Sequence, residues 1–394
     1  MTTRSLHTAL GLLLFAGAGC ASTVALDHAV IAYDTTMTES LEKQLLLNIA
    51  RARHNEPIHF TAISSIAATY KFTFGAGIGG AMTGESGGLI VPLVNGSVEE
   101  NPTISIAPME GEEFTQRLLT PFEERKLTLL LRQGYDVDSL LRLLGAELSL
   151  TDGASGRSAP HHNRPADESG YPLFRRVVAH LSSIQDRHAL YVEPLHFQLA
   201  WTVPVQAVTP ESVGSTYKDF ALSLTADKRS YRVSKRVNGR VMITNYDPSL
   251  LTNDQRVELH AEADEAPPND ILLDIRAGHP GGEVPLHGRL RLRSFHEVLT
   301  FLGRGMEEER EFEVAPDPRT PVLSENPSHT LEIVEARRLP SGTGLSVKLH
   351  GRSYALKPES GYQWNKKVFA LLYQLFQMSV SSNVNTGPEI TIAK

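Results

Sequence analysis

The single cysteine of the chain, Cys20, restricts its fold more than any other feature. A chain with one cysteine forms no internal disulfide, so packing and hydrogen bonds must hold the fold together. Its 394 residues are long enough for two or three domains. The chain has 21% charged and 41% hydrophobic residues, an ordinary globular balance, so we expect hydrophobic cores in its domains.

The segment before Cys20 has the pattern of an export signal. It begins with a basic residue, Arg4, continues with an apolar stretch over residues 10–15, and ends in small residues. The apolar stretch is too short to span a membrane in the mature protein. The pattern resembles a bacterial lipoprotein signal, although Gly17 stands where such signals usually carry leucine. The resemblance implies a signal peptide over residues 1–19, cleavage before Cys20, and fatty acids attached to that residue.

The residue after the cysteine bears on which membrane holds the protein. Ala21 follows Cys20, whereas the sorting rule of enteric bacteria uses aspartate there to retain a lipoprotein at the inner membrane. The resemblance therefore implies an outer-membrane lipoprotein that faces the periplasm. Several acyl chains on one residue would hold it firmly on a bilayer.

The charge balance bears on the partners of the protein. The formal net charge is -7 with both signs mixed along the chain, whereas nucleic-acid binding needs a basic surface. We therefore expect no nucleic-acid partner. The expected partners are the membrane, through the lipid on Cys20, and a protein of the cell envelope.

Hydrophobic periodicity predicts both helices and strands along the chain. A first amphipathic helix begins at a cap formed by Thr36 or Thr38 and ends at Pro57. Alternation over residues 70–74 predicts a strand, and a second strand follows at residues 103–109. The dipeptide Asn238-Gly239 between two alternating segments is typical of a β-hairpin turn.

The order of these elements predicts an α+β fold with several domains, in which helices back small mixed or antiparallel sheets. A polar stretch rich in turn formers, residues 151–170, indicates a domain boundary. We expect an N-terminal helix/strand domain over residues 20–150, a middle α+β domain over 171–276, and a C-terminal βαββαβ domain over 286–394.

Several blocks of sequence carry a resemblance to a known family. They are EKQLLLNIARARHNEPIHFTAISSIAATY, NPTISIAPMEGEEFTQRLLTP, LRLRSFHEVLTFLGRG and GRSYALKPESGYQWNKKVFALLYQLFQM. Together they resemble a group of uncharacterised proteobacterial lipoproteins. The chain departs from that group near residues 352–356, where an aromatic-rich strand is usual. The resemblance implies an envelope location and a shared fold, and it implies no activity or cofactor.

A glycine-rich stretch over residues 72–90 contains two patterns known from catalytic and cofactor sites. Gly75, Gly77 and Gly80 form G-x-G-x-x-G, but the helix that a dinucleotide site needs does not follow, because more glycine and Pro92 come next. Ser86 lies in G-x-S-x-G, but the residues before it make a poor strand for a nucleophile elbow. We interpret the stretch as a loop between two strands that could touch a partner or the membrane face.

The remaining candidates are histidines and a basic strand. His161 and His162 are adjacent, so they point to different sides and suit a metal ion poorly. The segment RLRLRS alternates arginine and leucine, so one face of a strand would be basic. The candidate interaction surface consists of Arg289, Arg291 and Arg293 on that strand and Lys366 and Lys367 on a later helix.

The sequence thus favours a non-catalytic interaction or assembly module on a lipid anchor, and we assign no catalytic, cofactor or metal residue. Two alternatives remain open. One is an envelope serine hydrolase that uses Ser86, and the other is a carrier that binds an apolar ligand between sheet and helices.

Overall fold

The computed structural model describes residues 30–80, 90–151, 158–306, 311, 314–315, 317–323, 325–340 and 343–380, and it describes only the backbone of residues 63–80 and 90–103. The fold is α+β and multidomain, as expected from the sequence. The chain divides into two compact units. The segment His59–Phe114 belongs to one, and the segments Leu41–Ile58 and Thr115–Ser381 form the other. Cys20 and Ser86 lie outside the described residues.

The first unit contains a long antiparallel hairpin of strands β1 (Phe60–Gly80) and β2 (Ile90–Met109). A bulge between Ile63 and Ser65 shifts the register once. The strands are much longer than the sequence predicted, because the glycines of the G-x-G-x-x-G pattern lie within β1 rather than in a loop. Glycine keeps both backbone hydrogen-bonding groups, so the ladder can continue through it although it has a low strand propensity.

A helix over residues 30–53 precedes this hairpin. It begins before Thr36 and Thr38, so neither residue is its cap; the Thr36 hydroxyl instead donates to the carbonyl of Ala32 at 2.8 Å. A threonine inside a helix can satisfy its hydroxyl in this way, so threonine alone does not mark a helix start. The second half of the helix buries the predicted apolar face, including Leu45 and Ile49.

The second unit contains a mixed seven-stranded sheet. Its strands are β3 (Gly145–Thr151), β4 (Ser158–His162), β5 (Tyr191–Pro204), β6 (Ala221–Leu224), β7 (Ser230–Thr244), β8 (Asp270–Ile275) and β9 (Leu286–Leu292). Six strands follow the order β4-β3-β9-β8-β7-β5, β6 pairs with β7, and only the β7–β8 pair is parallel. The sheet joins strands from all three segments expected as separate domains, because β9 pairs with both β3 and β8.

Helices also occur along the described chain after β2. They are α2 (Glu112–Leu119), α3 (Glu124–Arg132), α4 (Val137–Leu144), α5 (Gly170–Asp186), α6 (Pro210–Ser215), α7 (Asn253–Asp264), α8 (Phe295–Arg304) and α9 (Trp364–Val380), with 3-10 turns η1 (Val205–Ala207) and η2 (Pro248–Leu250). Leu259 and Ala263 of α7 pack against Leu195, Met242 and Leu272 of the sheet. Phe295 of α8 and Phe376 of α9 have ring centroids 5.6 Å apart. Apolar stripes at helical spacing thus build the core.

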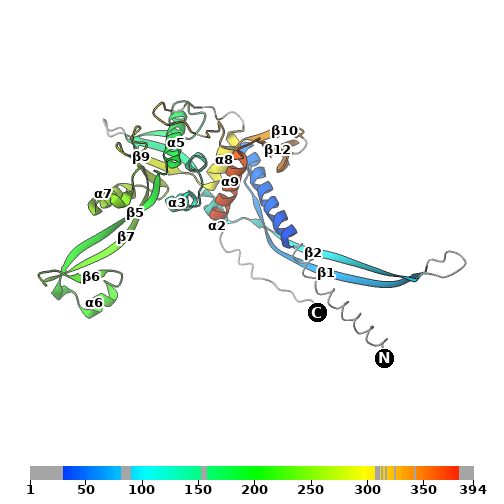
Figure 1. The fold of residues 1–394 in the computed structure, drawn as a ribbon, viewed down its shortest axis with the longest axis horizontal. Helices are drawn as coiled ribbons and strands as arrows, with labels where there is room; N and C mark the ends of the chain where they lie inside the picture. The colour runs from blue at the N-terminus through cyan, green and yellow to red at the C-terminus, as the bar shows by residue number, and fades with distance from the viewer. Residues whose placement is uncertain are drawn as a thin grey trace. The chain divides into compact units, whose positions relative to one another are not determined.

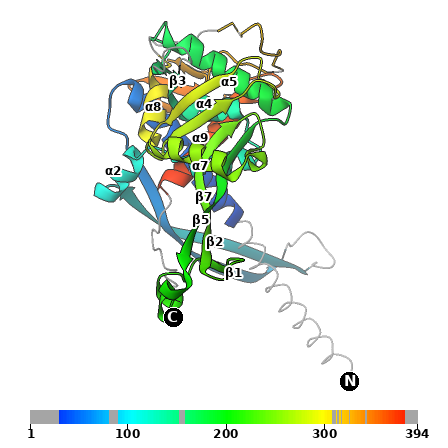
Figure 2. The ribbon, with the colours of Figure 1, turned by 90° about the vertical axis from the view of Figure 1, so that its left-hand side faces the viewer.

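The outer parts of β5 and β7 leave the body of this unit as an arm with β6 and α6 at its tip (Figures 1 and 2). The dipeptide Asn238-Gly239 lies inside β7 and does not form the predicted hairpin turn. Asn238 pairs with His196 of β5, beside a shift in register between Pro194 and His196. Pairing with a distant strand therefore overrides the local turn signal.

A three-stranded sheet completes the unit, in the order β10 (Ile333–Ala336), β12 (Arg352–Leu356), β11 (Ser346–Leu349). The turn between β11 and β12 uses positive φ at both His350 and Gly351, which is typical of a two-residue hairpin loop. His54, at the end of the first helix, lies 3.0 Å from the hydroxyl of the buried Tyr354. This contact ties the helix to the small sheet.

Candidate functional site

Strand β9 carries Arg289 and Arg291 of the candidate surface, Arg293 follows its last residue, and its alternation is as predicted up to Leu292. Leu286, Leu290 and Leu292 are buried. Arg291 is half exposed, and its Nε lies 3.2 Å from Asp270 while its Nη1 lies 3.5 Å from Glu147. Arg289 donates to the carbonyl of Glu262 at 2.8 Å and lies 3.4 Å from the Glu265 carboxylate. Acidic residues of the same chain therefore neutralise much of the positive charge of Arg289 and Arg291.

Arg293 is buried, so its predicted place on an exposed basic face is wrong. Strand β9 ends at Leu292, and the alternation of faces ends with it. The Arg293 guanidinium donates to the carbonyls of Arg142, Leu143 and Asn163 at 3.2, 3.1 and 2.5 Å. It thereby caps the end of helix α4, where carbonyls carry partial negative charge. Burial lowers the pKa of Arg293 to about 9.

The two lysines of the candidate surface lie on helix α9, and both are exposed. Lys367 donates to the Tyr362 hydroxyl at 2.8 Å, and its Nζ lies 4.2 Å from the centroid of that ring. It lines a cavity of about 230 Å³ together with Trp364 and Tyr135. None of the three arginines lines this cavity, so the structure does not join the two halves of the candidate surface there.

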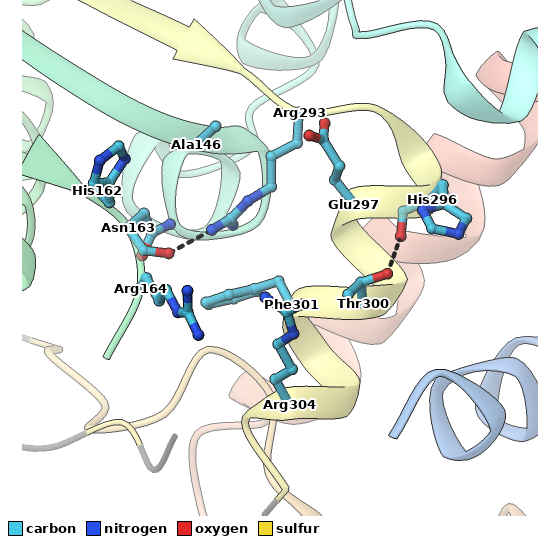
Figure 3. A pocket seen from close by; sticks show the side chains of 10 residues that line it. All are labelled: Ala146, His162, Asn163, Arg164, Arg293, His296, Glu297, Thr300, Phe301 and Arg304. Carbon is cyan, nitrogen blue, oxygen red and sulfur yellow. Dashed lines mark hydrogen bonds between the residues drawn. The ribbon is translucent and has the colours of Figure 1, made fainter. Parts of the chain in front are cut away.

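A larger cavity of about 470 Å³ lies beside helix α8 (Figure 3). It is lined by Ala146, His162, Asn163, Arg164, Arg293, His296, Glu297, Thr300, Phe301 and Arg304. Arg293 lies over the Phe301 ring, with 4.0 Å between the guanidinium carbon and the ring centroid. The lining contains three arginines and one carboxylate, so its chemistry suits an anionic group. The guanidinium of Arg293, however, already donates hydrogen bonds to backbone carbonyls.

A second cluster of charged groups joins β8, β9 and α7. His287 Nε2 lies 2.7 Å from Glu262, and its Nδ1 lies 3.4 Å from Asp274. These hydrogen bonds, with that of Asp274 the stronger influence, raise the pKa of His287 to about 9. Tyr246 donates to the other Asp274 oxygen at 2.5 Å, and burial together with this bond raises the pKa of the phenol. His287 is thus a cation at neutral pH, which suits an ion pair and not a general base.

The tip of the β5–β7 arm exposes apolar side chains that the sequence analysis did not single out. Trp201 and Leu199 of β5 are each 42% exposed, and Leu224 of β6 is 48% exposed. The rings of Trp201 and Phe220 meet edge to face at 5.3 Å, and Lys235 lies 5.2 Å from the centre of the Phe220 ring. The signal was present in the sequence as the segment LAWTV, whose apolar residues do not alternate with polar ones.

No family model, curated protein or solved structure matches the chain. Within the described ranges, no helix is long and apolar enough to cross a membrane. In the same part of the chain, no group of three or more His, Cys, Asp or Glu side chains has a geometry that could hold a metal ion.

Proposed function

We propose that the protein is a lipid-anchored lipoprotein of the outer membrane, faces the periplasm, and acts as a non-catalytic interaction or assembly module. Support for the anchor comes from the signal-like segment and the lone Cys20. Support for the interaction role comes from one observation, the exposed aromatic and aliphatic tip of the β5–β7 arm.

The arm has the properties of a contact surface for another protein. Trp201, Leu199 and Leu224 lie within paired strands, so their positions are held by the β5–β7–β6 ladder. Clustered apolar side chains on a protein surface mark interaction sites, and aromatic residues contribute most to binding energy there. Lys235 beside Phe220 adds a cation at the rim. An envelope protein with an apolar, weakly acidic surface would fit this tip.

The two alternatives have less support. The hydrolase hypothesis depends on Ser86, which lies outside the described residues. A carrier of apolar ligands needs an enclosed apolar cavity of several hundred cubic ångströms. The cavity beside α8 contains three arginines, and the cavity of about 720 Å³ along β5 contains Arg232, Arg236 and Arg256. Neither lining favours an apolar ligand.

The interaction role is tested by crosslinking in intact cells. A photoreactive amino acid replaces Trp201 in the full chain, and a second variant carries it at Leu250, an apolar residue that is 83% exposed and belongs to η2, not to the strands of the arm. We expect one discrete crosslinked product from position 201 and none from position 250. Equal products from both positions, or none from position 201, would contradict a contact at the tip.

The anchor is tested separately, by mass spectrometry of the protein purified from its native membrane. We expect fatty acids on the peptide that begins at Cys20. An unmodified cysteine, or a peptide that still carries the preceding residues, would refute the anchor and leave the arm unaffected.

A further inference from the structure

The β1–β2 hairpin has one consistently apolar face along its outer half. Strands alternate faces with a period of two, and the register pairs Phe72 with Val98 and Gly80 with Ile90. Even positions of both strands therefore share a face. From 72 to 80 these positions are Phe, Phe, Ala, Ile and Gly, and from 90 to 98 they are Ile, Pro, Val, Gly and Val. None is polar or charged.

The length of this apolar segment matches a bilayer. It covers residues 72–80 and 90–98, nine positions in each strand. A strand that crosses the hydrocarbon layer needs about 9–11 residues. The odd positions lie on the opposite face and are Thr, Gly, Gly and Gly in β1 and Val, Leu, Asn and Ser in β2, so all polar residues of the segment share this one face.

Charged residues lie only at the two ends of the segment. Lys71 and Glu99 pair in register immediately outside the segment, at its inner end, which is the end nearer Phe60 and Met109, and Glu100 follows. Between Lys71 and Glu99 the sequence holds one charged residue, Glu85, between the two strands. The chain as a whole is 21% charged, so a run of this length would ordinarily carry several more. Charges confined to the ends are what a membrane-crossing segment requires, because a charge in hydrocarbon is costly.

Aromatic residues gather where the charges begin. Tyr70, Phe72 and Phe74 share a face of β1 at the inner end of the segment. Aromatic side chains are enriched at the boundary between hydrocarbon and water, where an apolar ring can meet polar headgroups. The length of the segment, the position of the charges and the position of the aromatic residues are therefore each typical of strands that cross a lipid bilayer.

We propose that the β1–β2 hairpin inserts residues 72–80 and 90–98 into a lipid bilayer, with its even-numbered face against the acyl chains. Within the described residues β1 and β2 form a sheet of two strands, so each has an outer edge without a strand partner. Unpaired backbone groups are not tolerated in hydrocarbon, and a lone hairpin is marginal in water. The proposal therefore assigns these partners to hairpins of further copies of the chain. The proposal goes beyond the lipid anchor and does not require it.

The test uses the full chain with Cys20→Ser and one new cysteine at each position from 73 to 78, labelled with the environment-sensitive dye NBD. Vesicles of phosphatidylethanolamine and phosphatidylglycerol are the probe. We expect the emission to shift to the blue at 74, 76 and 78 and to stay unchanged at 73, 75 and 77. A cysteine at Ser223, an exposed position on β6, is the control and should report water throughout.

The same scan in the lipid-bearing protein separates insertion from anchoring, because the acyl chains already hold that protein on the vesicle. Absence of alternation in both forms would overturn the proposal. The proposal would also be overturned if the emission shift already alternated fully between even and odd positions without vesicles. A protein surface, and not lipid, would then cover the even-numbered face. Loss of acylation at Cys20 would affect only the proposed anchor.

A charge variant gives a second measurement. Ala76→Arg places a cation on the apolar face, and Thr73→Arg places one on the other face. In the Cys20→Ser chain we expect Ala76→Arg to lower flotation with vesicles by roughly tenfold or more and Thr73→Arg to change it little. Equal loss in the two variants would contradict a lipid-facing side.

Discussion

His287 Nε2 lies 2.7 Å from Oε1 of Glu262, and this contact joins strand β9 to helix α7. Asp274 on β8 approaches the other ring nitrogen, so the imidazole is held between two carboxylates from different elements. Pairing of this kind stabilises the folded state only while the imidazole is protonated. The cluster therefore makes the packing of α7 on the sheet dependent on pH.

The first prediction concerns that pH dependence. The pKa of His287 is about 9 in the folded protein and 6.5 as its ordinary value, so protonation favours folding. The contribution should be complete below about pH 6.5 and should be lost as the pH rises through about 9. Because the side chain is 40% exposed, we expect a loss of only about 1 kcal/mol or less.

The measurement is the free energy of unfolding in urea at about pH 6 and about pH 9.5. His287→Gln should remove most of the difference between the two values. If the wild type and His287→Gln lose the same free energy over this range, the cluster does not contribute in the way described.

The second prediction concerns the buried Arg293. Arg293→Met removes the donors to the carbonyls of Arg142, Leu143 and Asn163 and leaves them buried without those partners. We expect a loss of about 3 kcal/mol in the free energy of unfolding. Arg304→Ala, an exposed arginine from the same cavity, should cost about 0.5 kcal/mol or less. Similar small losses in both variants would indicate that Arg293 does not cap helix α4.

The third prediction concerns the close approach of helix α8 to the helix over residues 30–53. A Cβ atom at Gly303 would lie 2.7 Å from the backbone nitrogen of Arg53 and 2.9 Å from the carbonyl oxygen of Ile49. Gly303→Val should therefore force the helices apart and cost about 1–3 kcal/mol. Gly305→Ala is the control, because its added atom would have no neighbour closer than 3.5 Å. The measurement is the thermal unfolding midpoint of both variants. Equal midpoints would argue against tight packing between α8 and the first helix at Gly303.

The fourth prediction concerns Asn163, which lies between β4 and α5. Its buried amide donates to the carbonyls of Arg142 and Gly145 at 2.9 and 2.8 Å, and so joins this connection to the end of α4. Asn163→Ala should cost about 1–3 kcal/mol, because two buried acceptors lose a donor. Asn163→Asp should not restore the loss, since a carboxylate cannot donate. Full stability of the alanine variant in urea would contradict this role.

Sequence patterns predicted local features of this fold better than long-range ones. Apolar spacing correctly indicated the buried face of the first helix at Leu45 and Ile49, and alternation correctly indicated which side of β9 is buried. The burial of Arg293 was not predictable, because it depends on the point where β9 ends and on carbonyls contributed by α4. Local periodicity carries no information on either.

The same distinction explains the turn predicted at Asn238-Gly239. The dipeptide has the right chemistry for a tight hairpin, but β5 offers a partner along the whole length of β7. The extra strand pairs outweigh one favourable turn. The apolar tip of the arm was overlooked for a related reason, since consecutive apolar residues in LAWTV are typical of a buried strand until the topology shows that this part of β5 is exposed.

The central position of β9 has a kinetic consequence. Gly145 of β3 pairs with Leu292 of β9, so two segments far apart in the chain must meet before the sheet closes. High contact order of this kind slows folding. A chain that ends before Leu286 would leave β3 and β8 with open edges, which attract other strands and favour aggregation. The larger unit should therefore fold only as a whole, after its last third has been synthesised.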